Sequence, residues 1–150
     1  MKMILIVEDE YGNAEILQLL LEAEGYRVAL ASNGQQALDI LRTSEKPALI
    51  LSDFMMPVMN GGEFGQALSQ DPALSQIPFI FMSATSQDVV RRVFGGYDAF
   101  MVKPIEFDSL LRVVKRLIAE GKMARPAAAN GQVEESMRHL LKGIHIPSRD

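Results

Sequence analysis

The sequence predicts an α/β fold of the (βα)5 type, in which five parallel strands form a doubly wound sheet. Two observations lead to this prediction. Runs of strand length that are almost wholly apolar alternate with segments in which apolar residues recur at helical spacing. Strands that are apolar along their whole length are typical of a parallel sheet covered on both faces by crossover helices. The chain has 150 residues, 48% of them hydrophobic, which suffices for the core of one compact domain.

The elements are expected in strict alternation. The expected strands are Met3–Val7, Tyr26–Ala31, Ala48–Leu51, Ile77–Met82 and Ala99–Val102. Five helix faces are marked in turn by Ile16, Leu17, Leu20 and Leu21, by Ala37, Leu38 and Leu41, by Phe64 and Leu68, by Val89, Val90 and Val93, and by Leu110, Leu111, Val114 and Leu117. The expected strand order is flavodoxin-like, 2-1-3-4-5. Because crossovers are right-handed, such a sheet places functional residues directly after its strands.

The periodicity ends in the segment GKMARPAAANG, residues 121–131, whose Pro, Ala and Gly content indicates a linker. A further helical face follows, formed by Val133, Met137, Leu140, Leu141 and Ile144. We therefore expect one domain at residues 1–121 and, at 122–150, a linker and a short C-terminal helix without an output domain. Because so short a helix is marginal alone in water, it should dock on this domain, on a second copy or on the downstream target, of which the first two are favoured; a disordered extension is the alternative.

Composition and charge exclude several classes of function. The chain has no cysteine, which excludes disulfides and cysteine-based zinc sites. Residues 1–121 carry 10 Lys and Arg against 16 Asp and Glu, and this acidic body argues against direct binding of nucleic acid. The apolar run Met3–Val7 is too short for a signal peptide or a membrane span. We expect a cytoplasmic protein without a membrane association.

Residues with chemical potential follow four of the expected strands. Glu8 and Asp9 close the first strand, Asp53 the third, Ser83 the fourth and Lys103 the fifth. Converging carboxylates repel one another unless they bind a hard cation, for which Mg2+ is the default and Mn2+ the alternative. Such a cation would keep Asp53 ionised and nucleophilic, while Ser83 and Lys103 hold the oxygens of a transferred phosphoryl group. Each residue alone reads as a helix cap or a surface charge, but their conjunction predicts phosphoryl transfer to Asp53.

Four segments together resemble the receiver domains of bacterial response regulators, including the chemotaxis regulators, over roughly residues 1–120. They are ILIVEDE at residues 4–10, LILSDFMMPVMNG at 49–61, FMSAT at 81–85 and FMVKP at 100–104. The resemblance implies that Asp53 takes the phosphoryl group from a phosphohistidine. It also implies that Asp9 binds the metal directly, Glu8 through water, and Met55 through its main-chain carbonyl.

The resemblance further implies a switch pair, Ser83 and Phe100, in which the ring follows the hydroxyl toward the phosphoryl group. Phe100 stands where tyrosine is frequent, so it has no hydroxyl for a partner contact.

The implied function is that of a single-domain response regulator in a two-component phosphorelay, which catalyses only its own phosphorylation and slow dephosphorylation. Its partners would be a sensor histidine kinase or histidine phosphotransfer protein and a downstream protein target, contacted through a face that contains Arg91, Arg92, Tyr97 and Lys115. A homodimer is left open.

Three rival functions are weaker on the residues. A haloacid-dehalogenase-type phosphatase would need a second aspartate two residues after its nucleophile, and neither Asp9 nor Asp53 has one. A flavin-binding module would need a phosphate-cradling loop after the first strand, where the acidic residues 8–10 stand instead. The alternative that remains is a phosphorylation-independent adaptor on the same fold, which the complete set of site residues disfavours.

Overall fold

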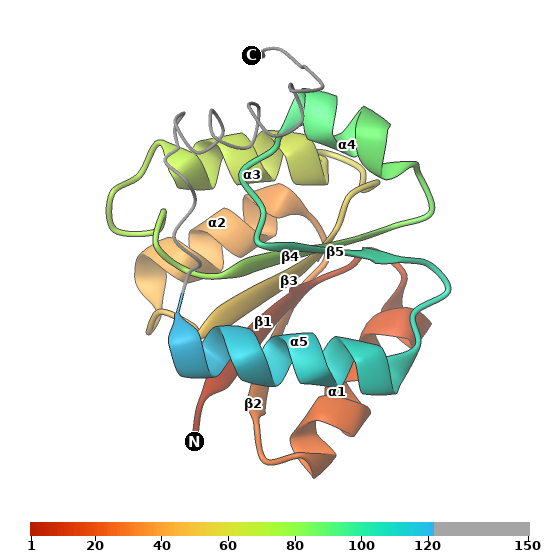
Figure 1. The fold of residues 1–150 in the computed structure, drawn as a ribbon. Coiled ribbons are helices and arrows are strands. Elements are labelled where there is room, and N and C mark those ends of the chain that lie inside the picture. The colour runs from red at the N-terminus through yellow and green to blue at the C-terminus, as the bar shows by residue number, and fades with distance from the viewer. Residues whose placement is uncertain (122–150) are drawn as a thin grey trace.

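The computed structural model describes residues 1–121 and confirms the predicted fold (Figure 1). The strands of this part of the chain are β1 (Met3–Val7), β2 (Arg27–Ala31), β3 (Leu49–Asp53), β4 (Phe79–Ser83) and β5 (Ala99–Val102). Its helices are α1 (Tyr11–Ala23), α2 (Gly34–Thr43), α3 (Gly61–Ser69), α4 (Gln87–Val93) and α5 (Phe107–Glu120). All strands run parallel, in the order β2-β1-β3-β4-β5. The linker and C-terminal helix expected at 122–150 lie outside the described residues.

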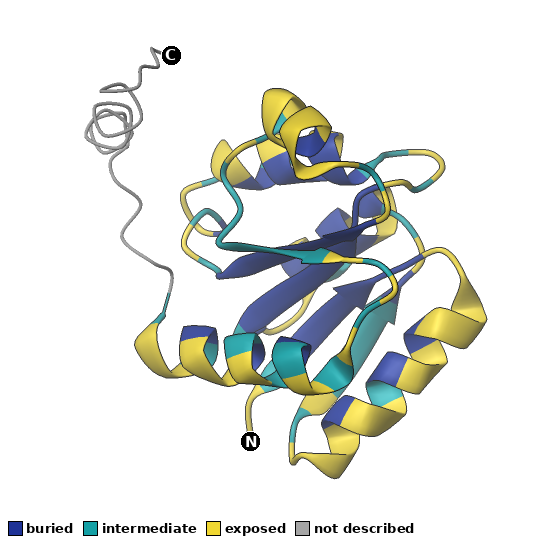
Figure 2. Ribbon diagram, turned by 45° about the vertical axis from the view of Figure 1, so that its right-hand side comes forward, coloured by how far each residue is buried: buried dark blue, intermediate teal, exposed yellow. Residues whose placement is uncertain are grey.

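The sheet separates two apolar cores. Helices α1 and α5 cover one face of the sheet, and α2, α3 and α4 cover the other (Figure 1). The strand β1 serves both cores, because Ile4 and Ile6 point into the first and Leu5 and Val7 into the second. The central strands are consequently buried on both sides, while the outer faces of the helices are exposed (Figure 2). This explains why the strands read as continuous apolar runs in the sequence.

The expected strand bounds need small corrections at three strands. β2 begins at Arg27 rather than Tyr26. β3 begins at Leu49 rather than Ala48 and runs on to Asp53, and β4 begins at Phe79 rather than Ile77 and runs on to Ser83. The two polar residues remain in the sheet because the ladder continues through them: Asp53 pairs with Met82, and Ser83 pairs with Val102. An apolar run marks the buried part of a strand, but hydrogen bonding sets where the strand ends. Asp53 and Ser83 are therefore fixed by the sheet itself.

Two of the expected helix faces differ from the structure. In α1, Leu17 and Leu21 are buried as expected, but Ile16 is 58% and Leu20 38% exposed, and Ala14 completes the buried stripe instead. In α4, Val90 is buried, whereas the flanking valines of the expected face are exposed. A helix laid on a sheet buries one narrow stripe, so additional apolar residues beside it remain at the surface. The other three faces are buried or half-buried as expected.

Side-chain caps fix where the helices begin. Asn60 and Glu63 form a reciprocal capping box at the start of α3, with Glu63 N donating to Asn60 Oδ1 at 2.9 Å and Asn60 N donating to Glu63 Oε1 at 3.0 Å. Ser86 caps α4 by accepting from Val89 N. These caps hold α3 and α4 directly after the loops that follow β3 and β4. Within the described residues, no helix has the length and apolar character that a membrane crossing requires.

Candidate functional site

Three carboxylates meet at the carboxyl edge of the sheet. β1 and β3 are parallel neighbours with Val7 opposite Ser52, so the residues that follow Val7 lie beside Asp53. One oxygen each of Glu8, Asp9 and Asp53 lies within 4.8 Å of the others. Glu8 is 4% and Asp53 5% exposed, whereas Asp9 opens to solvent. The convergence predicted from the positions after the strands is therefore present.

Lys103 completes this cluster from the far side of β4. Its backbone N donates to the carbonyl of Ser83 at 3.0 Å, which continues the ladder one residue beyond β5. Its Nζ lies 3.1 Å from Asp53 Oδ2 and 3.4 Å from Glu8 Oε1. The expectation that a lysine after a buried strand needs an anionic partner is met here by two carboxylates at once.

The electrostatics of the cluster are dominated by excess negative charge. Burial and the charge of Asp53 raise the pKa of Glu8 to about 7, although the N–H of Glu10 and the ammonium of Lys103 oppose this shift. Burial lowers the pKa of Lys103, but the nearby charges of Asp53 and Glu8 outweigh it, so that this pKa lies above its usual value. One ammonium does not balance three carboxylates.

The donor set fits a hard divalent cation. It consists of carboxylate oxygens alone, gathered within 4.8 Å, and such ligands favour Mg2+ or Mn2+ over softer metals. The raised pKa of Glu8 has the same origin, because a buried carboxyl without enough positive charge nearby keeps its proton. A divalent cation here would supply the charge that Lys103 alone does not.

The carboxylate of Asp53 is held at both oxygens. Its Oδ1 accepts from the backbone N–H of Phe54 at 3.0 Å, and its Oδ2 faces the ammonium of Lys103. The start of α3 lies directly against this residue, since a Cβ at Gly61 would come within 2.6 Å of the Asp53 carbonyl oxygen. Sequence reasoning did not assign Gly61 this role, but the pattern Asn-Gly-Gly-Glu at residues 60–63 is a capping-box signature that could have placed the helix start.

The remaining candidate residues occupy different surroundings. Ser83 is fully buried at the end of β4, and its Oγ accepts from Thr85 N at 2.8 Å, which leaves the hydroxyl proton for another acceptor. Phe100 lies opposite Phe81 in the register of β4 and β5 and is half-buried. Met55, two residues after Asp53, has a side chain that is mainly in solvent, at 62% exposure.

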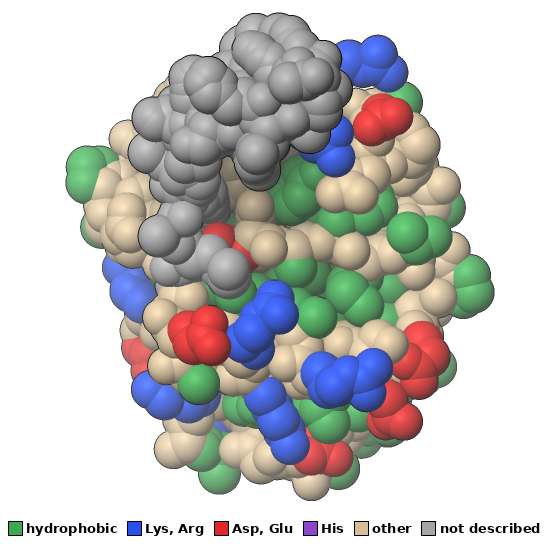
Figure 3. All heavy atoms as spheres, viewed as in Figure 1, with side chains coloured by type: hydrophobic (Ala, Val, Ile, Leu, Met, Phe, Trp, Pro, Cys, Tyr) green, Lys and Arg blue, Asp and Glu red, His purple; other side chains and the backbone are tan. Residues whose placement is uncertain are grey.

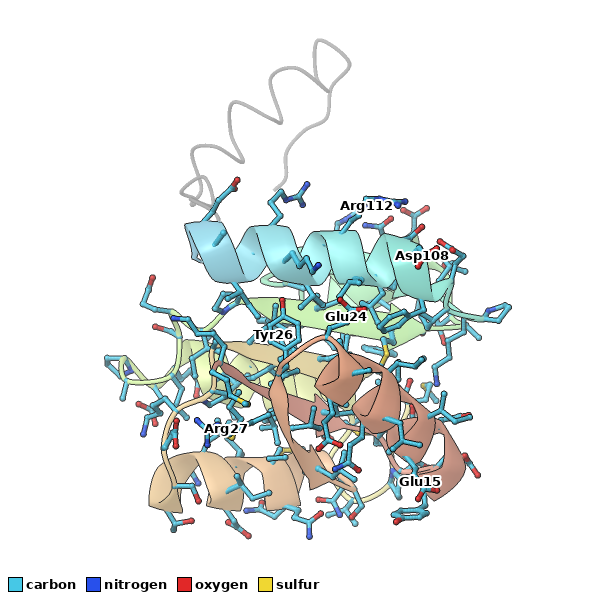
Figure 4. The ribbon with its side chains drawn as sticks, turned by 90° about the horizontal axis from the view of Figure 1, so that it is seen from below. Glu15, Glu24, Tyr26, Arg27, Asp108 and Arg112 are labelled. Atoms are coloured by element: carbon cyan, nitrogen blue, oxygen red, sulfur yellow. The ribbon has the colours of Figure 1, made fainter. Side chains whose placement is uncertain are left out.

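A pocket of about 310 Å³ opens beside the carboxylates, between α1 and the start of α5. Its polar lining comes from Glu8, Asn13 and Lys103. Apolar walls come from residues that include Ile16 and Leu20 of α1 and Phe107 of α5. Two of the exposed apolar side chains of α1, Ile16 and Leu20, thus border the site. Figure 4 shows this side of the molecule, with α1 and α5 both facing the viewer.

Comparison with known proteins gives one family. A family model of the response regulator receiver domain matches residues 4–115. The response regulator Rre1 of Synechocystis sp. is 34% identical over 152 residues, a match that takes in 97% of this chain but 65% of Rre1, so the chain spans slightly less than two thirds of that relative. The polar-differentiation response regulator DivK of Brucella anthropi is 34% identical over 121 residues, which cover 79% of this chain and 98% of DivK.

A solved structure agrees with the sequence matches. The response regulator TrrA of Thermotoga maritima, in complex with Mg(2+)-BeF, superposes with a TM-score of 0.70 at 31% identity, over 78% of this chain and 99% of TrrA. The residues matched by the family model include the whole carboxylate cluster and Lys103. The chain therefore belongs to the response regulator receiver domain family, whose members are signalling proteins of two-component systems.

Proposed function

We propose that this chain is a phosphorylation switch in which Asp53 accepts a phosphoryl group from the phosphohistidine of a sensor kinase or histidine phosphotransfer protein. The observation that carries the proposal is the geometry around Asp53: its buried carboxylate lies beside those of the buried Glu8 and the exposed Asp9 and contacts Lys103. A carboxylate fixed at the end of a rigid strand is suited to act as a nucleophile. An oxygen of Asp53 attacks phosphorus, the bond between phosphorus and the histidine nitrogen breaks, and the imidazole leaves.

Glu8, Asp9, Asp53 and the main-chain carbonyl of Met55 would hold Mg2+, with Mn2+ as the alternative. The ion would neutralise phosphoryl oxygens as negative charge spreads over them. The similar protein TrrA forms a complex with Mg(2+)-BeF, and this supports the choice of magnesium here. Loss of the Glu8 proton would accompany metal binding, because the neutral carboxyl is a poor ligand.

Lys103 and Ser83 would hold the other phosphoryl oxygens. The ammonium of Lys103 already contacts Asp53 Oδ2, so it lies within reach of a group attached to that carboxylate. The hydroxyl of Ser83 would donate its proton to a phosphoryl oxygen, and Phe100, its partner in the switch, would follow this movement. Hydrolysis of the aspartyl phosphate would be slow and self-catalysed, and the chain would act on no other substrate.

The phosphodonor would dock on α1 and the pocket beside it. Ile16 and Leu19 are 58% and 61% exposed there, and the pocket gives access to the cluster through Glu8 and Lys103. A helix with aliphatic side chains would bury this surface while its histidine approaches Asp53. The exchange would take place in the cytoplasm, between proteins.

A downstream protein target would bind the face formed by α4, β5 and α5, which is at the front in Figure 3. Figure 3 shows hydrophobic side chains along β5 with Lys and Arg side chains on either side. Val102 is 66% exposed on this face, and Arg91 and Arg92 of α4 and Lys115 of α5 are exposed as well. The chain would pass on its signal through such contacts, as a single domain at residues 1–121. If it forms a homodimer, a measurement of the molecular mass of the full chain would detect it.

The test is phosphorylation by acetyl phosphate in the presence and absence of MgCl2, followed by intact mass measurement. We expect one added phosphoryl group on the wild-type chain with Mg2+, and none after chelation or in Asp53→Asn. Asp39→Asn, an exposed aspartate of α2, is the matched control and should be labelled like the wild type. Labelling of Asp53→Asn would contradict the proposal.

A further inference from the structure

Tyr97 belongs to an aromatic group centred on Phe81 of β4. Tyr97 stands in the loop before β5 and is half-buried. Its ring centroid lies 5.5 Å from that of Phe81 and 5.9 Å from that of Phe100. Phe81 in turn contacts Phe54, the residue after Asp53, at 5.5 Å in an edge-to-face arrangement. The ring of Tyr97 is therefore two aromatic contacts away from the residue that follows Asp53.

The hydroxyl of Tyr97 contacts α4 rather than another ring of this group. Gln87, the first residue of α4, donates from its Nε2 to the hydroxyl oxygen of Tyr97 at 3.0 Å. The ring alone would fill the same space in a phenylalanine, so packing does not require the oxygen. Phe100, the neighbouring ring, has no hydroxyl with which to make such a bond.

α4 is the shortest of the described helices and has the fewest buried residues. It has seven residues, of which Val90 is buried. Two polar side-chain contacts fasten it from outside: Gln66 of α3 donates to the carbonyl of Val93 at 2.7 Å at one end, and Gln87 binds Tyr97 at the other. A short helix with one buried side chain is held weakly by apolar contacts, so polar fastenings decide its position.

A second connection links the same end of α4 to the phosphorylation site. Ser83 Oγ accepts from the backbone N–H of Thr85, and the next residue, Ser86, is the cap of α4. Any shift of the Ser83 hydroxyl toward a group on Asp53 therefore pulls on the loop that carries Gln87. The backbone of this loop would transmit the displacement to Gln87, whereas the hydroxyl of Tyr97, held by its ring contacts, would oppose it.

We propose that Tyr97 and Gln87 form a latch that couples the position of α4 to the phosphorylation state of Asp53. The latch rests on the proposed function, because phosphorylation supplies the displacement. Tyr97 acts as a positioning residue: its ring fixes the hydroxyl against Phe81 and Phe100, and the hydroxyl fixes the first turn of α4. Phe100 has no hydroxyl, but the adjacent ring of Tyr97 has one, and α4 is the element that responds.

Amide hydrogen exchange of the full chain, with and without acetyl phosphate and MgCl2, tests the latch. In the wild type, phosphorylation should change the exchange rates of the α4 amides. Tyr97→Phe should exchange two- to tenfold faster in α4 before phosphorylation, as expected for the loss of one hydrogen bond, and its response to phosphorylation should fall by at least half. Gln87→Ala should behave in the same way, and the double variant should add nothing.

Two control variants separate the hydrogen bond from packing and helix stability. Gln87→Glu keeps an oxygen to which the Tyr97 hydroxyl can donate, so it should retain the wild-type response. Tyr26→Phe, which removes a hydroxyl on the far side of the sheet (Figure 4), should leave α4 unchanged. A labelled Tyr97→Phe with the full wild-type response in α4 would overturn the latch alone. A wild-type chain that gains no phosphoryl mass would overturn the proposed function, and the latch with it.

Discussion

Lys103 reaches past the end of β4 to Asp53, with its Nζ 3.1 Å from Oδ2 of a carboxylate two strands away. The same ammonium contacts Glu8 at 3.4 Å, so it joins the ends of β1, β3 and β5. With no metal bound, much of the repulsion between the carboxylates is offset by this one charge. The contact therefore matters for stability as well as for phosphoryl transfer.

Lys103→Ala should destabilise the metal-free protein. The side chain is 27% exposed, so the cost should be about 2 kcal/mol in the free energy of unfolding, below that of breaking a fully buried pair. Lys115→Ala is the control, because it removes a more exposed contact with Glu24 at 3.6 Å and should cost less than about 1 kcal/mol. Urea unfolding in EDTA measures both. Equal losses of unfolding free energy in the two variants would mean that the contacts of Lys103 stabilise the fold no more than an exposed ion pair does.

Stability should fall with rising pH when no divalent cation is present. The pKa of Glu8 is about 7 in the folded chain, against an ordinary value of 4.5, so between these pH values the folded state binds the extra proton. The contribution is therefore complete below about pH 4.5 and is lost as the pH rises to about 7. Its size is on the order of 3 kcal/mol at most. Urea unfolding at pH 5 and pH 8 in EDTA should show this loss.

Two comparisons isolate Glu8 as the cause. Glu8→Gln removes the titration, so most of the pH dependence between 5 and 8 should disappear, and the variant should be more stable than the wild type at pH 8. Added MgCl2 should restore stability to the wild type at pH 8 but much less at pH 5, where Glu8 keeps its proton. An unchanged pH profile in Glu8→Gln would assign the loss to other groups.

Val58→Gly should stabilise the protein. Val58 has a φ of 67° in the loop between β3 and α3, a conformation that is strained for a β-branched residue, and its side chain is 80% exposed. Glycine relieves a strain of about 1–2 kcal/mol, while its greater freedom in the unfolded chain costs about 0.5–1 kcal/mol. The net gain should be a few tenths to about 1 kcal/mol by urea unfolding. Val58→Ala keeps the Cβ and should gain less; a loss of stability in the glycine variant would argue against strain.

The fold and the meeting of the site residues could be predicted because both depend on the order of short apolar strands and the polar residues that follow them. Once the sheet is parallel, Asp53 and the residues after β1 share one edge regardless of side-chain detail. The exposure of Ile16 and Val89 could not be predicted in this way, since a pattern of apolar residues does not distinguish a buried stripe from an apolar surface.

The contacts between side chains from separate loops could not be predicted from the sequence either. The double contact of Lys103 and the bond from Gln87 to Tyr97 depend on rotamers and loop paths that no fixed spacing encodes. The same holds for the pKa of Glu8, which is set by how deeply the loop after β1 is buried. Sequence reasoning predicted which residues meet, but not how their charges are balanced.

Removal of residues 122–150 should leave the domain folded. Both cores consist of residues between Ile4 and Ile118, so the truncated chain keeps every described apolar contact of the sheet. The sequence predicts a docked helix beyond residue 121, and its loss should lower helicity or change the molecular mass of the assembly. Circular dichroism and light scattering on the full and truncated chains decide this. If neither quantity changes beyond the residues removed, the segment does not dock.

Met55→Asn should accelerate loss of the phosphoryl group. The residue lies two positions after Asp53, and its side chain is 62% exposed, so a polar side chain here would meet solvent close to the proposed aspartyl phosphate. A thioether does not orient water, whereas an asparagine amide does, so the rate should rise roughly tenfold, below the range typical of general base catalysis. Met55→Leu keeps the apolar character and should retain the slow wild-type rate. The rate is measured for all three proteins as the decay of the phosphorylated mass after removal of acetyl phosphate. An unchanged rate in Met55→Asn would show that the attacking water is positioned by another residue, and Thr85, which has a hydroxyl, would be the next residue to replace.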